Sequence, residues 1–238
     1  MKPPAQLDAL LARKRLLGSQ AGASAATATR LRELRAWQAA RLARTYADLR
    51  REPRYALAVE FFLSDLYGPQ DFTGRDRDLA RAWRYLRRAL PAAALDVLGR
   101  AIELEVLTAE LDQAMVAALE TGAVTSTTYA AAYRAVGRRA ARARQIELIA
   151  AIGADLERIV RHAWIAMALR VAHAPAHAAG FGVLQDFLER GFAAFRRMRG
   201  AGRFVQAIRE REARVMNAIY AGGDVPSGTS VIPAETAP

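Results

Sequence analysis

The sequence predicts an all-α fold, a single multi-helix bundle of eight or nine helices around one long central helix. Apolar residues recur with a period near 3.6 along almost the whole chain, and no segment alternates as a strand would. Hydrophobic residues make up 53% of the 238 residues, so the chain can bury a substantial core. Many of them are alanine, the best helix former. Composition and periodicity therefore favour the same fold class.

The first half of the chain is predicted to form five helices. A weak linker at 18–23 separates the first two, and Ser24 or Thr27 can cap the second. Gly68-Pro69 ends the third helix. Pro91 suits the first turn of the fifth, because its missing N–H would have no partner there. The expected ranges are 5–17, 24–51, 54–67, 76–90 and 91–121.

The second half is predicted to contain four helices and a tail. The long helix at 138–173 carries Ile146, Ile149 and Ile152 on one face and is the candidate central helix. The expected helix ranges are 125–137, 138–173, 183–199 and 202–221. Three segments result: a mobile N-terminal amphipathic helix with its linker at 1–23, a helical domain at 24–221 and a disordered tail at 222–238.

The composition excludes several classes of protein. Without cysteine there is no disulfide framework, thiolate metal site or cysteine nucleophile. No apolar run approaches the ~20 residues that span a bilayer, and the N-terminus lacks the apolar core of a signal peptide. Glycine-rich nucleotide loops and the Gly-x-Ser-x-Gly elbow are missing from the sequence. We therefore expect a cytoplasmic protein without a membrane partner or a cofactor.

The chain is strongly basic, with a formal net charge of +11 and only two lysines among its 35 basic residues. Such a charge can neutralise nucleic-acid phosphates. Residues 118–129 resemble a helix-turn-helix and precede an arginine-rich helix. Because 24 acids are interleaved with the basic residues, a solvated helix capped by Thr125 or Ser126 explains the pattern as well. The candidate nucleic-acid-binding residues are Arg134, Arg138, Arg139 and Arg142.

The densest stretch of the chain lies at 61–78, where an apolar helix end runs into alternating acids and arginines. Helix capping explains much of it, because acids favour the first turn of a helix. Carboxylates beside aromatic residues require a partner, and Arg75 is close enough in sequence to provide one. The stretch is therefore either a structural clamp or a site for an anionic or polar ligand. The candidate ligand-binding residues are Asp65, Tyr67, Asp71, Phe72, Arg75 and Asp76, with His177.

The pattern FFxxDLYGxxDFxxRD runs through this stretch from Phe61 to Asp76. It resembles the signature of a family of uncharacterised bacterial, mainly proteobacterial, helical proteins. The resemblance extends more loosely to Leu90-Pro91, to 175–180 and to 187–192. It implies an all-helical domain of unknown function and assigns neither a reaction nor a catalytic residue.

Three histidines, His162, His173 and His177, are close enough in sequence to raise the question of a metal site. On one continuous helix His162 and His173 would lie ~16 Å apart along the axis, too far to share an ion. His173 and His177 have the i, i+4 spacing of a metal-binding pair, but Pro175 is expected to break the helix between them. Neither Glu-x-x-His nor His-Glu-x-x-His occurs. We therefore predict no metal site.

Taken together, these patterns predict a helical protein for interaction or small-ligand binding, without identifiable catalytic machinery. The alternative is a nucleic-acid-binding protein that uses its arginine-rich surface. A further alternative is an enzyme whose site is the corner formed by Asp65–Asp78. A protein partner or a homo-oligomer fits the first interpretation, and the sequence leaves the ligand, any reaction and the oligomeric state open.

Overall fold

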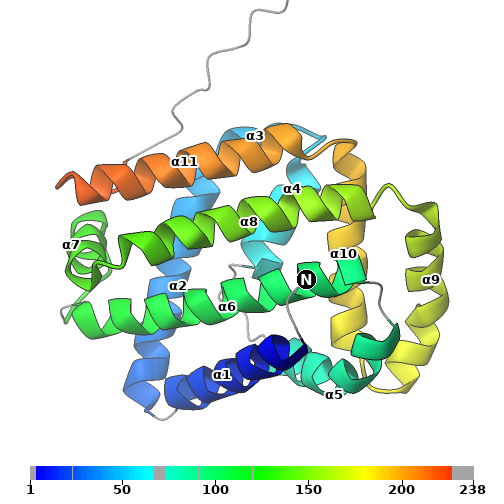
Figure 1. The fold of residues 1–238 in the computed structure, drawn as a ribbon. Helices are drawn as coiled ribbons and strands as arrows, with labels where there is room; N and C mark the ends of the chain where they lie inside the picture. The colour runs from blue at the N-terminus through cyan, green and yellow to red at the C-terminus, as the bar shows by residue number, and fades with distance from the viewer. Residues whose placement is uncertain (1–3, 23, 67–72, 90–91, 120, 227–238) are drawn as a thin grey trace, which may run out of the picture.

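The computed structural model describes residues 4–22, 24–66, 73–89, 92–119 and 121–226. Over these residues it contains eleven α-helices, one short π-helix and no strand, which confirms the all-α class (Figure 1). The helices outnumber the predicted eight or nine because two of the predicted helices are each divided in two. Within the described ranges, no helix combines the length and the apolar character that crossing a membrane requires.

The elements follow one another with short connections. The first half of the chain forms α1 (Pro4–Gly22), α2 (Ala25–Thr45), α3 (Ala47–Arg51), α4 (Ala56–Phe61), the π-helix η1 (Phe62–Leu66), α5 (Thr73–Ala89) and α6 (Ala92–Ala118). The second half forms α7 (Ser126–Val136), α8 (Arg139–Ile159), α9 (Ala163–Ala178), α10 (Gly182–Met198) and α11 (Gly202–Tyr220).

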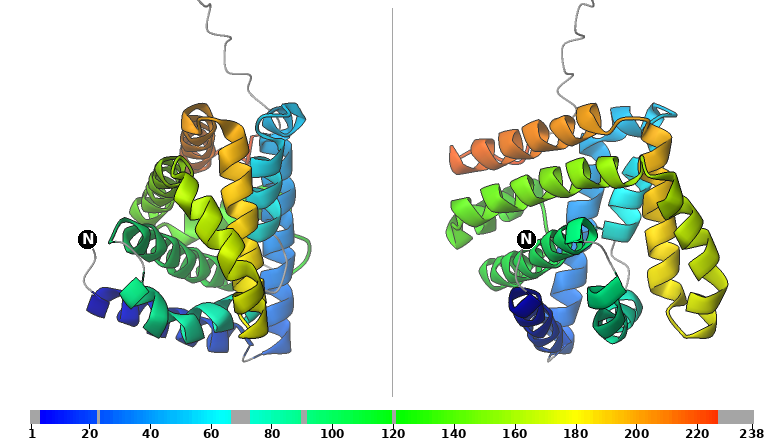
Figure 2. Two further views of the ribbon diagram at one scale, coloured as in Figure 1. Left: turned by 90° about the vertical axis from the view of Figure 1, so that its right-hand side faces the viewer. Right: turned by 45° about the vertical axis from the view of Figure 1, so that its right-hand side comes forward.

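Four helices lie side by side as one layer, in the order α1, α6, α8 and α11 (Figure 1). A second set, α2, α4 and α10, runs across this layer, as the two turned views in Figure 2 show. The largest core cluster lies where the two sets meet and includes Leu42, Phe62, Met198 and Phe204. α9 packs along α10 at the edge of the molecule, outside both layers.

The N-terminal helix is longer than predicted and joins the bundle. α1 continues through residues 18–22, which were predicted to be a linker. Leu7, Leu11 and Leu17 are at most 5% exposed and belong to a core cluster that also contains Ile102 of α6. α1 is therefore a packed part of the bundle, which differs from the mobile helix that the sequence suggested.

The predicted helix at 24–51 is divided at Tyr46, which is 1% exposed. The Tyr46 hydroxyl donates a hydrogen bond to Glu212 of α11 at 2.8 Å, and Arg41 donates to the same oxygen at 2.6 Å. Burial and the neighbouring Glu212 raise the pKa of Tyr46 well above its ordinary value, so the hydroxyl stays protonated. The break at Tyr46 thus allows its buried hydroxyl to hydrogen-bond to Glu212. No local sequence signal indicates this break.

The predicted central helix at 138–173 is wrong, because the chain turns at 160–162 and forms α8 and α9 instead. Neither glycine nor proline marks this turn, and the β-branched pair Ile159-Val160 lowers helix propensity only slightly. Val160 packs against the core cluster between the layers, and the turn brings α9 back along α10. Tertiary packing, and not a local signal, therefore ends α8.

The first residues of the predicted disordered tail pack against α7. Val225 is 6% exposed, and its N–H donates a hydrogen bond to the Ser126 hydroxyl at 3.1 Å. Thr127 donates to the Asp224 carboxylate at 2.8 Å. The rest of the predicted tail, 227–238, lies outside the described residues.

The ion pair between Asp48 of α3 and Arg211 of α11 leads to a pH prediction. Arg211 is 5% exposed and donates to both carboxylate oxygens of Asp48, at 2.7 and 2.6 Å. These hydrogen bonds lower the pKa of Asp48. Because the folded pKa lies below the unfolded value of about 3.9, the pair stabilises the fold above that pH and is lost as the pH falls through the folded pKa. We expect the free energy of unfolding in urea to fall less for Asp48→Asn than for the wild type as the pH is lowered from 6. Equal decreases in the two proteins would contradict this explanation.

Candidate functional site

The described part of the Asp65–Asp78 corner is held together by ion pairs. Asp65, near the end of η1, accepts two hydrogen bonds from Arg190 of α10, at 2.6 and 3.0 Å. Ser64 donates a third at 2.8 Å. The Asp65 side chain is only 13% exposed. Asp65 therefore joins η1 to α10.

Arg75 of α5 is also engaged inside the protein, where it is 7% exposed. It donates to Glu105 of α6 at 2.6 Å and to the backbone carbonyl of Asp65 at 3.2 Å. Its guanidinium lies 4.8 Å from the centre of the Phe187 ring of α10. Arg75 thus joins α5 to α6, η1 and α10, and binding a ligand anion would compete with the Glu105 pair.

The predicted ligand site is described only in part. The residues that lie outside the described ranges are Tyr67, Asp71 and Phe72, and the side chain of Asp76 is not described either. His177 pairs with Asp186, which lies one turn before Arg190 on α10. α10 is therefore the common neighbour of Asp65, Arg75 and His177, although the described contacts do not join His177 to the other two.

The four arginines of the predicted nucleic-acid interface lie around the junction of α7 and α8. Thr125 caps α7, one of the two caps expected from the sequence. Arg134 donates to the backbone carbonyl of Ile219 in α11 at 3.3 Å and to that of Gly223, just after α11, at 2.9 Å, and Arg139 donates to Asn217 at 2.8 Å. Arg138 is exposed at the start of α8 and has a left-handed backbone with φ of 50°. Two of these four cations therefore bind α11.

Arg142 lies still deeper, at 4% exposed. Its guanidinium is 4.3 Å from the centre of the Tyr133 ring, and its Nε and Nη2 have no hydrogen-bond partner among the described residues. Burial raises the pKa of Tyr133, so the ring under the cation stays neutral. Because a phosphate could reach Arg142 only by opening the core, the junction offers fewer accessible cations than the sequence pattern implied.

One surface hollow lies away from the corner, between α2 and the α6–α7 connection. It is open to solvent, and Arg30 in its wall already pairs with Glu33 at 2.7 Å. The lining residues are Arg30, Glu33, Ala36, Trp37, Gly122, Ala123 and Val124. None of these residues belongs to the predicted ligand site.

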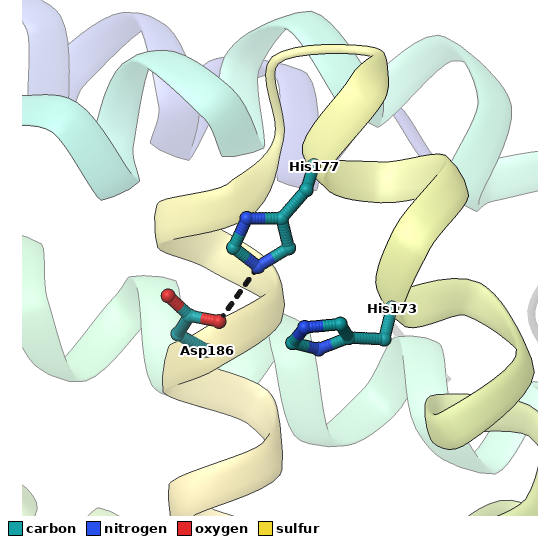
Figure 3. A group of neighbouring side chains, drawn as sticks. All are labelled: His173, His177 and Asp186. Atoms are coloured by element: carbon teal, nitrogen blue, oxygen red, sulfur yellow. Dashed lines mark hydrogen bonds and ion pairs between the residues drawn. The ribbon is translucent and has the colours of Figure 1, made fainter.

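Two histidines and two acids meet between α9 and α10. His177 Nε2 lies 2.8 Å from a carboxylate oxygen of Asp186, and His173 Nδ1 lies 3.0 Å from one of Glu189. The centroids of the two imidazole rings are 4.5 Å apart. Figure 3 shows both rings extending from α9 toward α10. We call these four residues the histidine–carboxylate cluster.

The prediction that Pro175 breaks the helix between the histidines is wrong. α9 runs through Pro175 to Ala178. Proline lacks its own N–H and crowds the carbonyl four residues earlier, but the next turn still closes through a hydrogen bond from the Ala179 N–H to the Pro175 carbonyl at 3.0 Å. His173 and His177 therefore stand one turn apart on the same side of α9.

The sequence pattern did not single out the α10 members of the cluster, Asp186 and Glu189. Gln185, which is 6% exposed, donates to Glu189 and to the Leu169 carbonyl of α9, both at 2.8 Å. The hydrogen bonds from Gln185 and His173 hold the pKa of Glu189 below its ordinary range. The available signal was the spacing of these residues, because two acids three residues apart closely follow two histidines four residues apart. This spacing indicates a common cluster only if α9 and α10 are known to pack against each other.

The side of α9 turned away from α10 is apolar. Trp164, Met167 and Val171 are 58%, 61% and 67% exposed, and no residue of α9 is buried. At 100° per residue these three side chains fall within about 60° of one another. Exposed small residues complete this surface, which we call the α9 outer face: Ala168, Ala174, Pro175 and Ala178. No charged residue lies within it.

These observations define an all-α protein in which many arginines and acids tie helices together, while the α9–α10 hairpin exposes a histidine–carboxylate cluster and an apolar helix face. The chain belongs to the family described as Domain of unknown function (DUF8198), whose model matches residues 18–226. This span includes both the Asp65–Asp78 corner and the hairpin. No curated protein and no solved structure matches the sequence.

Proposed function

We propose that this protein is an interaction protein whose α9 outer face pairs with the same face of a second copy. The proposal rests on three large apolar side chains of α9 that are each more than half exposed: Trp164, Met167 and Val171. Contiguous apolar surface of this kind marks interaction sites in soluble proteins. In this proposal the protein acts in the bacterial cytoplasm, which a chain without cysteine fits.

A second copy is the occupant that the charge distribution favours. The chain carries a net charge of +11, so two copies repel each other over most of their surfaces. The α9 outer face contains no charge, so two-fold packing there places apolar side chains at the centre of the contact, with the exposed Arg170 at its border. Small residues such as Ala168 and Ala174 lie beside the large Trp164 and Met167 on this face. The large side chains of one copy can therefore pack against the small residues of α9 in the second copy.

The size of the face sets the expected strength of pairing. α9 has 16 residues and is therefore about 24 Å long. One face of such a helix supplies far less than the roughly 800 Å² per partner of a standard stable interface. The proposed dimer is accordingly weak and reversible, as expected of a regulatory or transient association.

The alternative functions have weaker support. Of the nucleic-acid candidates, Arg134 and Arg139 are bonded to α11 and Arg142 is buried. A catalytic or anion-binding role for the Asp65–Asp78 corner must compete with the Arg75–Glu105 and Asp65–Arg190 pairs. Both remain hypotheses, because Arg138 is exposed and other arginines, such as Arg158 and Arg161, are accessible on the surface.

Sedimentation velocity of the wild type should show a monomer at low concentration and a dimer as the concentration rises to about 1 mM. Met167→Glu places a charge within the paired face and should shift the dimer to concentrations at least ten times higher. Leu16→Glu is the matched control, because Leu16 is a 47% exposed apolar residue on α1. A wild type that stays monomeric over this range, or a Leu16→Glu variant that loses pairing equally, would overturn the proposal.

A further inference from the structure

The histidine–carboxylate cluster differs from an ordinary pair of surface salt bridges in its geometry. One ligand atom each from His173, His177 and Asp186 can be chosen so that all three lie within 4.8 Å of one another. The two histidines project from one helix and the acid from the next, so the three groups approach a common point from two sides (Figure 3). A point between them is reachable from solvent, because the side chains of His173, His177 and Asp186 are 49%, 42% and 41% exposed.

We infer that His173, His177 and Asp186 bind a divalent transition-metal ion, and that the ion is Zn²⁺. Two imidazole nitrogens and one carboxylate oxygen match the ligands of zinc sites that retain an open position for water. Imidazole suits zinc far better than it suits the hard cations Mg²⁺ and Ca²⁺, which take oxygen ligands. The open position faces solvent.

The distances are compatible with an ion after small side-chain rotations. Zinc bonds of about 2.0–2.2 Å in a tetrahedron place ligand atoms ~3.4 Å apart. The longest of the present separations, at most 4.8 Å, therefore has to shorten by up to about 1.4 Å, whereas the 2.8 Å separation between His177 Nε2 and Asp186 has to lengthen slightly. Exposed histidine and aspartate side chains can make such a movement without shifting α9 or α10.

The surrounding residues already orient one of the ligands. Glu189 lies 3.0 Å from His173 Nδ1, which leaves Nε2 of His173 for the ion, as in the carboxylate–histidine–metal arrangement. Gln185 fixes Glu189 in turn through its 2.8 Å hydrogen bond, and Gln185 is itself nearly buried. Glu189 thus acts as a positioning residue and Gln185 supports it.

Zinc at this point would join α9 to α10 next to the turn between them. The inference is independent of the pairing proposed for the α9 outer face, which lies on the other side of the same helix. Binding of the ion to the folded state alone stabilises that state. We therefore expect zinc to raise the unfolding temperature of the protein.

Isothermal titration of the untagged full chain with zinc chloride tests the inference. The wild type should bind one equivalent of zinc. His177→Gln and Asp186→Asn each remove a ligand and should weaken binding at least about 100-fold, whereas Glu189→Gln should weaken it about tenfold. His162→Gln is the matched control, because His162 is an exposed histidine at the start of the same helix and outside the cluster. This variant should bind zinc as the wild type does.

A second readout separates a specific site from loose surface binding. Cobalt substituted for zinc should give the visible absorption of a tetrahedral centre in the wild type and in His162→Gln, and lose it in His177→Gln. Met167→Glu should retain full zinc affinity even where pairing is lost. The inference is overturned if the wild type takes up no zinc, or if His177→Gln and Asp186→Asn bind it as tightly as the wild type; the cluster is then a set of hydrogen bonds only.

Discussion

Glu212→Leu is expected to lower the free energy of unfolding by about 3–5 kcal/mol, because it leaves a buried cation without its partner. The side chains of Arg41 and Glu212 are 11% and 14% exposed. Burial disfavours the charge on Arg41, but Glu212 outweighs this and raises the pKa of Arg41. The substitution also removes the acceptor of the buried Tyr46 hydroxyl. Urea unfolding followed by circular dichroism at 222 nm measures the loss.

Glu147→Leu is the matched control for this prediction. Glu147 of α8 pairs with Arg209 of α11 at 2.7 Å, but its side chain is 54% exposed, so its loss should cost less than about 1 kcal/mol. Replacing both buried partners, in Arg41→Met with Glu212→Leu, should recover much of the stability that Glu212→Leu alone loses. Equal effects of Glu212→Leu and Glu147→Leu would show that the buried network does not carry the stability assigned to it.

Gly153→Leu is expected to cost about 3 kcal/mol, because Gly153 of α8 lies directly against Val205 of α11. A Cβ at this position would come within 2.5 Å of a methyl carbon of Val205 on α11. Valine is stiff at χ1 and cannot easily turn away. Leucine is a better helix former than glycine, so local propensity favours the substitution and any loss is steric. The same unfolding experiment measures it.

Gly18→Leu tests the same exchange without the steric conflict. Gly18 lies within α1, is exposed and has no atom within 4 Å of the position a Cβ would take. This variant should gain up to about 1 kcal/mol from helix propensity. Adding Val205→Ala to Gly153→Leu should restore part of the loss. A Gly153→Leu protein as stable as the wild type would mean that α8 and α11 pack less closely than described.

Local signals in the sequence were sufficient where glycine or proline ends a helix. α10 and α11 lie within one residue of their predicted ranges, because glycines stand at 180, 182, 200 and 202 around their ends. The turn at 160–162 could not be predicted, since it depends on Val160 entering the core and on α9 returning along α10. The break at Tyr46 likewise depends on Glu212, which is 166 residues away in sequence.

The same limit applies to the sites. Arg75 was recognised as a cation near buried acids, but its partner Glu105 is 30 residues away and nothing local indicates it. His173 and His177 were recognised as a possible metal-binding pair, but the helix break expected at Pro175 led to the prediction of no metal site, and His177 was kept only as a candidate ligand-binding residue. Proline inside a helix loses one hydrogen bond and crowds the carbonyl four residues earlier, yet α9 continues through Pro175 while it packs along α10. Asp186 and Glu189 complete the cluster, and they can be identified only when it is known which residues of α10 lie opposite the histidines of α9.

The central claim, that the α9 outer face meets its own copy, is tested most directly by cysteine cross-linking, because the natural chain contains no cysteine. Val171→Cys lies near the middle of the face, where a two-fold axis brings equivalent residues together. Under mild oxidation it should form a covalent dimer. Ser19→Cys, at an exposed position on α1, should stay monomeric at the same concentration. A Val171→Cys protein that cross-links no faster than Ser19→Cys would contradict the claim.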